Sequence, residues 1–218
     1  MNIGSQITAS APGAALGRLL GAVPDAITGI ACLVVWISPL AFGQGAVKTV
    51  VLMMLMEFLL VHGTGFFTVV ALAADMSRGK RLSAMLGLLC FYALFVAAFA
   101  ASFKAWWPVG VFLWLAASKA VWIFVAPRDR EAETTRQMGA WAFSVVVYLA
   151  AVFGGLILPL PRLGITEELL PTLGLPGSGE WIERPHTAVA GMAFYYFAMA
   201  AFKWWRGGAA VPPLKKGD

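Results

Sequence analysis

Six long apolar runs, separated by shorter polar segments, set the pattern of this 218-residue chain. A transmembrane helix needs about 20 mostly apolar residues, and each run is near that length. The pattern therefore predicts an all-α, polytopic integral membrane protein built as a single transmembrane helical domain. We expect its six transmembrane helices over residues 26–42, 47–74, 82–103, 108–126, 138–160 and 187–205.

The connections between the runs are short, with one exception between the fifth and sixth runs. Residues 161–186 carry Thr166, a residue type that caps helices, followed by the helix breakers Pro171, Pro176 and Gly177. This order predicts a short surface helix and an ordered turn. Long loops of this kind commonly contact a partner or cover a cavity.

Basic residues are shared unevenly between the two sides of the predicted bundle. With an even number of spans both termini lie on one side, which carries eleven Lys and Arg residues against four on the other, while Lys119 lies inside a span. Because cytoplasmic loops are enriched in Lys and Arg, we expect a multi-pass protein of a bacterial-type cytoplasmic (inner) membrane, with both termini in the cytoplasm. The eleven are Arg18, Arg78, Lys80, Arg81, Arg128, Arg130, Arg136, Lys203, Arg206, Lys215 and Lys216, and the four are Lys48, Lys104, Arg162 and Arg184.

This topology accounts for the net charge of +5 without a nucleic-acid partner. The expected partners are membrane lipids, whose anionic headgroups Lys215 and Lys216 would touch, and further copies of the chain or other members of a membrane complex. A small ion or small molecule is the expected substrate class.

Composition agrees with the apolar pattern. With 60% hydrophobic and only 12% charged residues, the chain is excluded from the soluble globular class, in which about a quarter of residues are charged. Residues 1–23 lack the charged start and cleavage site of a secretory signal. We therefore expect the N-terminus to be retained, with a short interfacial helix over residues 14–20.

Metal and cofactor chemistry finds little support in the sequence. Cys32 and Cys90 lie in apolar runs without a CxxC pattern, so they are interpreted as small hydrophobic residues. Glu180, Glu183 and His186 are weak metal candidates, since a second ExxH is absent and Pro185 interrupts the spacing. The histidines His62 and His186 lie at different depths and do not suit bis-histidine haem ligation. We expect no cofactor.

Three ionisable residues fall inside the predicted spans and form the candidate site. Counting about 1.5 Å per residue from the outer face places Glu57 at roughly 15 Å, His62 at roughly 22 Å and Lys119 at roughly 20 Å. Tyr195 and Tyr196 fall at roughly 13 Å, near the Glu57 level. Ionisable groups at such depths are rare and usually functional.

Two arrangements of this layer remain open. In the first, spans two, four and six face one another, Glu57 pairs with Lys119, and His62 and a tyrosine extend a chain of titratable groups. In the second, Lys119 extends towards the cytoplasmic headgroups, and Glu57 is protonated and hydrogen-bonded between helices.

His62 needs a helix irregularity to approach Glu57, because five residues on an α-helix rotate the side chain by roughly 140°. In regular geometry Val61 and Thr64 share the Glu57 face. The sequence Gly63-Thr64-Gly65 either introduces a kink or π-bulge that brings the two residues together, or allows close helix packing. The two alternatives are left open.

The favoured hypothesis is a small transporter or channel, working as an oligomer, that translocates protons or cations. Its pathway residues would be Glu57, Lys119, His62, Thr64, Tyr195 and Tyr196. One alternative is a non-transporting, membrane-embedded subunit of a larger complex. The other is an intramembrane enzyme acting on a lipid or quinone with Glu57 and His62 as acid and base, although an enzymatic role is less favoured.

Overall fold

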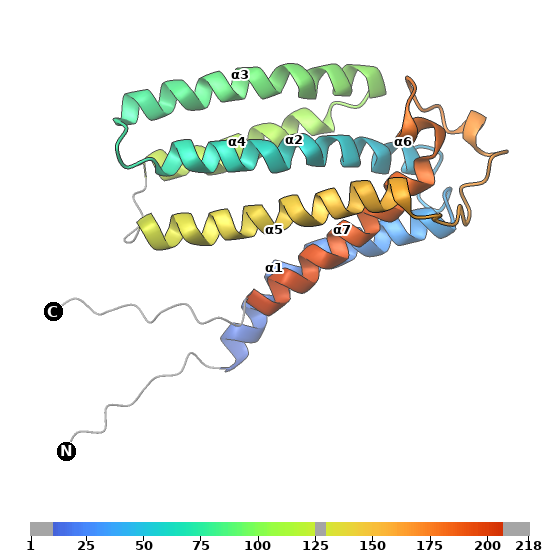
Figure 1. Ribbon diagram of the computed structural model, residues 1–218, viewed down its shortest axis with the longest axis horizontal. Helices are drawn as coiled ribbons and strands as arrows, with labels where there is room; N and C mark the ends of the chain where they lie inside the picture. Colours follow the sequence, from blue (N-terminus) through green and yellow to red (C-terminus); the bar gives the residue numbers. More distant parts are fainter. Residues whose placement is uncertain (1–10, 125–129, 207–218) are drawn as a thin grey trace.

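The computed structural model describes residues 11–124 and 130–206, which are entirely helical apart from their connections. These residues form seven α-helices and one short 3-10 helix (Figure 1). The six long helices are α1 (Ala11–Ile37), α2 (Ala46–Leu72), α3 (Arg78–Phe103), α4 (Trp107–Phe124), α5 (Arg130–Ile157) and α7 (Pro185–Arg206). The 3-10 helix η1 (Leu170–Thr172) and α6 (Glu180–Glu183) lie in the long connection before α7.

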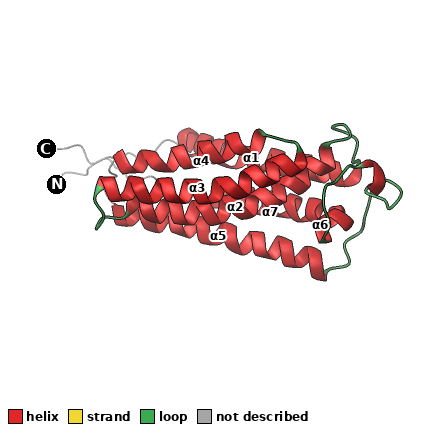
Figure 2. Ribbon diagram, turned by 90° about the horizontal axis from the view of Figure 1, so that it is seen from above, coloured by secondary structure: helices red, strands yellow, loops and turns green. Residues whose placement is uncertain are grey.

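Helix α2 is the centre of the bundle. It packs against α3, α4, α5 and α7, whereas α1 packs mainly along α7. In its most apolar stretch 56% of α2 is buried, compared with 22% in each of α1, α3 and α5. The pair α1 and α7 runs obliquely to the other long helices in Figure 1, and Figure 2 shows the helices, in red, joined by loops at the ends of the bundle. A residue on α2 is therefore well placed to meet groups from several helices at once.

Four helices are long and apolar enough to cross a membrane: Ala15–Ile37 of α1, Ala46–Leu72, Arg78–Phe103, and Glu131–Ile157 of α5. A shorter apolar helix covers Trp107–Val121 in α4. Because a soluble protein rarely contains even one such helix, these four indicate a membrane protein.

The connections gather at the two ends of the bundle. Residues 38–45, 104–106 and 158–184 lie at one end, which we call the α6 end (right in Figure 1). The 73–77 connection and the starts of α1 and α5 lie towards the other, which we call the turn end. Successive long helices therefore alternate in direction along the bundle.

Helix α1 corrects two sequence predictions. The expected interfacial helix over residues 14–20 is not separate, because α1 continues from Ala11 to Ile37 with Pro24 inside it. Proline lacks the N–H that would bond the carbonyl four residues earlier. The Pro24 carbonyl itself accepts a hydrogen bond from the hydroxyl of Thr28 at 2.9 Å. The first span was also expected to reach residue 42, but residues 38–42 form turns, since Pro39 disfavours helix at and before its own position.

Helix α2 bears on the two alternatives left open for Gly63-Thr64-Gly65. It is α-helical throughout Ala46–Leu72 and contains no π-helical turn, so the π-bulge considered for Gly63-Thr64-Gly65 is absent. The close-packing alternative is confirmed at Gly65, where an added Cβ would lie 2.7 Å from the Trp141 indole of α5. Glycine is therefore required here by the approach of a neighbouring helix rather than by a bend in α2.

The long connection contains short helical turns, as its caps and breakers predict. Thr166 does not begin an α-helix; its hydroxyl bonds the exposed carboxylate of Glu168 and holds the pKa of that group below its ordinary value. The connection returns to α1, where the indole of Trp36 donates to the Pro161 carbonyl at 3.0 Å. The α6 end of α1 is thereby tied to the loop that precedes α7.

Candidate functional site

A polar cavity of about 560 Å³ lies along α2 between α4, α5 and α7. Its lining includes five of the six predicted pathway residues, all except His62. We call it the Glu57 cavity. The side chains that give it its chemistry are Asp25, Glu57, Thr64, Trp114, Ser118, Lys119, Arg136, Gln137, Trp141, Ser144, Tyr195, Tyr196 and Lys203.

Glu57 is half-buried on α2, and its carboxylate accepts a hydrogen bond from the Tyr195 hydroxyl of α7 at 2.5 Å. Tyr195 is buried and is held edge-on between two further tyrosines. Its ring centroid lies 6.1 Å from that of Tyr148 and 5.3 Å from that of Tyr196. The Tyr148 hydroxyl is itself fixed by donation to the Met54 carbonyl at 3.0 Å. The aromatic side of the cavity therefore presents one hydroxyl to the carboxylate in a defined geometry.

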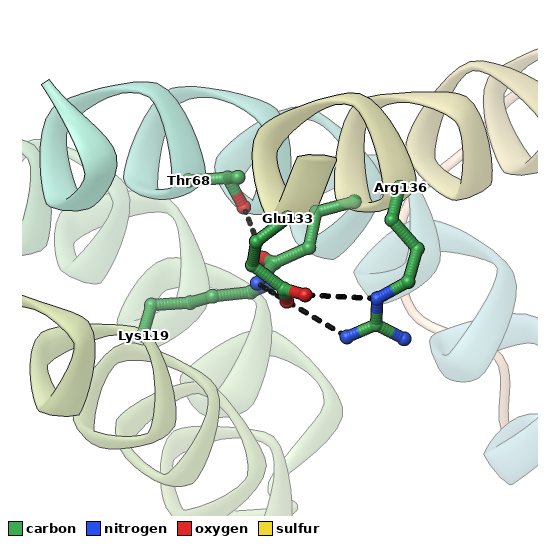
Figure 3. A network of polar contacts seen from close by, with 5 residues as sticks. Thr68, Lys119, Glu133 and Arg136 are labelled. Carbon is green, nitrogen blue, oxygen red and sulfur yellow. Dashed lines mark hydrogen bonds and ion pairs between the residues drawn. The ribbon is translucent and has the colours of Figure 1, made fainter. Parts of the chain in front are cut away.

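Lys119 extends away from Glu57. Its ammonium donates to Gln137 Oε1 at 2.8 Å, and Gln137 Nε2 donates to Glu133 at 2.6 Å (Figure 3). The same carboxylate receives two hydrogen bonds from Arg136, at 2.7 and 2.9 Å. The Thr68 hydroxyl reaches Gln137 Oε1 at 3.4 Å. Lys119 thus belongs to a polar network between α2, α4 and the start of α5.

This network lies at a different depth from Glu57. Thr68 follows Glu57 by eleven residues on α2, a distance of about 16 Å along the helix axis. The ion pair proposed between Glu57 and Lys119 is therefore not formed, and the alternative in which Lys119 extends towards the turn end matches the structure. The four-carbon stem of lysine allows its charge to lie well away from its Cα level.

A pair that sequence reasoning missed lies between Glu57 and the turn end. Lys203 of α7 and Asp25 of α1 form an ion pair at 2.6 Å, with side chains 42% and 14% exposed. Lys203 follows Tyr195 by eight residues, or about 12 Å of helix. The sequence signal for this pair was Asp25, an acidic residue just before a long apolar run. It was missed because an acidic residue at the expected start of a span is normally exposed at the membrane surface.

Towards the α6 end the cavity is closed by packed apolar side chains. On α2 these are Val47, Val51 and Met54, and on α7 Val189 and Met192, each 0% exposed. The cavity lining on these helices begins at Glu57 and Tyr195 and continues towards the turn end. Glu57 therefore lies at the closed end of a one-sided cavity.

Trp141 and Thr64 form part of the wall without adding free polar groups. The Trp141 indole donates to the Val61 carbonyl at 2.8 Å, in the space left open by Gly65. The Thr64 hydroxyl donates to the Leu60 carbonyl of its own helix at 2.6 Å.

His62 does not join this cavity. Because α2 is regular, its imidazole faces α3 and lines a separate groove. The Glu57 and His62 pair considered for intramembrane acid and base chemistry is therefore not assembled around one substrate.

The weak metal candidates are also dispersed. Glu180 pairs with Arg184 at 2.8 Å, and Glu183 accepts from the Gly179 backbone N–H at 3.4 Å. His186 is buried at the start of α7. Within residues 11–124 and 130–206 no three His, Cys, Asp or Glu side chains converge as a metal site. Cys32 and Cys90 are both free thiols.

Comparison with protein-family models, with curated proteins and with solved structures gives no match for this chain. Arguments about its function therefore rest on the geometry of the described residues.

Proposed function

We propose that this protein is a small transporter or channel of the cytoplasmic membrane that moves protons or cations by way of Glu57. The observation that carries the proposal is the one-sided polar cavity that ends at the Glu57 carboxylate. A dry, fully packed carboxylate would instead favour a structural role between helices. A cavity of about 560 Å³ has room for many water molecules, each of which occupies about 30 Å³ in the liquid.

The alternating direction of the six long helices supports a topology with six crossings. The turn end carries Arg18, Arg78, Lys80, Arg81, Arg130, Arg136, Lys203 and Arg206, and the α6 end carries Lys48, Lys104, Arg162 and Arg184. The positive-inside bias assigns the turn end to the cytoplasm. Arg128, Lys215 and Lys216, which contribute to the same bias in the sequence, lie outside the described residues. The cavity would then be open to the cytoplasm.

The order of groups along the cavity fits a pathway for positive charge. A proton or cation entering from the cytoplasmic side first meets the pair of Asp25 and Lys203, and then the tyrosines around Glu57. The ionised Glu57 carboxylate accepts a hydrogen bond from Tyr195. Hydrogen bonds to charged groups are about twice as strong as neutral ones, so neutralising the carboxylate weakens this hydrogen bond. Arrival of the ion would thereby loosen a contact between α2 and α7.

Helix α7 is suited to respond to that change. Gly191 lies against α5 so closely that an added Cβ would be 3.2 Å from the Ala151 carbonyl. Small residues at a helix contact permit sliding without large side chains that must repack. A shift of α7 would open the apolar contact of Met54 with the part of α7 nearest the α6 end. Glu57 would then be exposed to the non-cytoplasmic side.

The test is proton flux into liposomes that contain the purified protein and an internal pH-sensitive dye. We expect Glu57→Gln, which removes the titratable group but keeps the shape, to lower flux by at least about tenfold, since it deletes the acceptor. Glu131→Gln is the matched control, because Glu131 is exposed and lies outside the cavity lining.

Wild-type flux equal to that of protein-free liposomes, for protons and for Na⁺ or K⁺, would contradict the proposal and favour a non-transporting subunit of a membrane complex. Unchanged flux in Glu57→Gln would show that any pathway avoids this carboxylate.

A further inference from the structure

A second cavity, of about 520 Å³, lies between α2 and α3 on the opposite side of α2 from the Glu57 cavity. Its walls are mainly aromatic, and Trp181 of α6 lies at one end. We call it the His62 groove. It contains no Asp, Glu, Lys or Arg side chain; its polar side chains are His62, Tyr92 and the Trp181 indole. It opens sideways past the exposed rings of Phe91 and Phe95, on the face where lipid would lie.

The proton on His62 is placed by its own helix. Nδ1 lies 2.7 Å from the Phe58 carbonyl oxygen. A carbonyl oxygen only accepts, so Nδ1 must carry the hydrogen. In the neutral imidazole the other nitrogen, Nε2, is then an acceptor with a free lone pair. Within the described part of the chain no group hydrogen-bonds to Nε2. The groove therefore offers one hydrogen-bond acceptor in apolar surroundings.

Tyr92 adds a second polar group to the same groove. Its ring packs beside α2, where an added Cβ at Gly63 would lie 4.0 Å from the Tyr92 Cε2 atom. Its ring centroid is 6.2 Å from that of Phe67. No described residue hydrogen-bonds to the Tyr92 hydroxyl. A hydroxyl both donates and accepts, so it can serve a second oxygen of the same ligand.

These features discriminate between classes of ligand. An organic cation would find no carboxylate in the groove, and an anion would find no cation. A phospholipid acyl chain would leave Nε2 without a donor, at a cost of about 1–3 kcal/mol for a polar group left unsatisfied away from water. A neutral aromatic ring that carries a hydroxyl both stacks on the walls and donates to Nε2.

The geometry points to the His62 groove as a binding site for a lipid-soluble hydroquinone, with one ring hydroxyl donating to His62 Nε2 and the ring held among Phe58, Phe91 and Phe95. An adjoining groove of about 710 Å³, which shares Leu55, Phe99 and Trp181 with the first, continues towards the α6 end. It gives an apolar tail a continuous path. The inference concerns binding and is independent of ion movement through the Glu57 cavity.

The test is binding of 2-decylhydroquinone to the full-length protein in nanodiscs under anaerobic conditions, measured by calorimetry. The comparison ligand is its dimethyl ether, which keeps ring and tail but donates no hydrogen bond. We expect the wild type to bind the hydroquinone about tenfold more tightly than the ether, as one hydrogen bond in an apolar site provides.

His62→Phe keeps an aromatic ring but removes the acceptor. It should abolish the tenfold preference while leaving the affinity for the ether unchanged, which also shows that the groove remains folded. Tyr196→Phe, in the other cavity, is the control and should change neither affinity. Equal binding of the two ligands by the wild type, a preference that survives in His62→Phe, or the absence of binding would each overturn the inference.

Discussion

The Tyr195 hydroxyl and the Glu57 carboxylate meet across the contact of α7 with α2, 138 residues apart in sequence. No cation approaches the carboxylate within ion-pair distance among the described residues. Tyr195 is therefore its one direct side-chain partner there. The rings of Tyr148 and Tyr196 restrict the orientation of Tyr195 from two sides, so this hydrogen bond is held by packing as well as by its own strength.

Tyr195→Phe removes the hydroxyl and keeps the ring, so the packing of α7 should survive. The carboxylate then loses a charged hydrogen bond, a contribution of about 1.5–3 kcal/mol. We expect proton flux in liposomes at neutral pH to fall by about tenfold.

The matched variant is Tyr196→Phe, because Tyr196 lines the same cavity without a hydrogen bond to Glu57. In Tyr196→Phe, proton flux should fall by less than about twofold. Equal losses in the two variants would show that the tyrosines act through packing and not through the Glu57 hydrogen bond.

Depth counting along the sequence brings Tyr195 to the level of Glu57, and the two side chains do meet directly across the contact of α2 with α7. It does not locate the charge of Lys119, whose long stem carries the ammonium to Gln137, near the level of Thr68. Helix periodicity alone predicts that His62 and Glu57 lie on different faces of α2, provided that α2 is a regular helix. The role of Gly65 could not be predicted in the same way, because it depends on the close approach of Trp141 from α5, a contact that no local pattern reveals.

The space beside Gly65 is filled by the Trp141 indole, which bonds the Val61 carbonyl. Gly65→Ala places a Cβ 2.7 Å from the indole, so α5 must shift or the hydrogen bond must break. We expect a loss of about 1–3 kcal/mol in unfolding free energy, as for other overpacked sites. Thermal unfolding in detergent, followed by circular dichroism, measures it.

Gly87→Ala on α3 is the control, since an added Cβ there meets no atom within 4 Å. Alanine favours helix over glycine by about 1 kcal/mol, so this variant should be neutral or more stable. If Gly65→Ala is as stable as Gly87→Ala, the close approach of Trp141 is not limiting.

Arg81 joins the ends of two helices at the turn end. The residue is 5% exposed, and its guanidinium donates to the Ala71 carbonyl at 3.0 Å. This bond satisfies an acceptor that the C-terminus of α2 leaves free. The sequence assigns Arg81 only to the basic cytoplasmic side, because a charge pattern does not distinguish a buried arginine from a solvated one.

Arg81→Met should lower the unfolding free energy by about 1–3 kcal/mol, since a buried carbonyl loses its partner. Arg78→Met, three residues earlier and exposed, should change it by less than about 0.5 kcal/mol. The same thermal unfolding assay measures both. Equal effects would mean that Arg81 contributes only its charge.

His186, just before the expected span 187–205, links stability to pH. It is 2% exposed, and burial lowers its pKa, as do the nearby guanidinium groups of Arg162 and Arg184, against a smaller opposite effect of Glu180. The unfolded chain has the ordinary histidine value of about 6.5. Below that pH the unfolded state binds a proton that the folded state does not yet accept, so stability falls as pH decreases from about 6.5 towards the lower folded-state pKa.

His186→Asn removes this titration. We expect the unfolding midpoint of the wild type to fall further than that of the variant between pH 7 and pH 5. Unfolding midpoints of both proteins, measured at half-unit pH intervals in one detergent, test this. The decrease of the midpoint in the variant measures the effect of the acidic groups that both proteins share. Parallel curves for the two proteins would show that His186 has the same proton affinity in the folded and unfolded states.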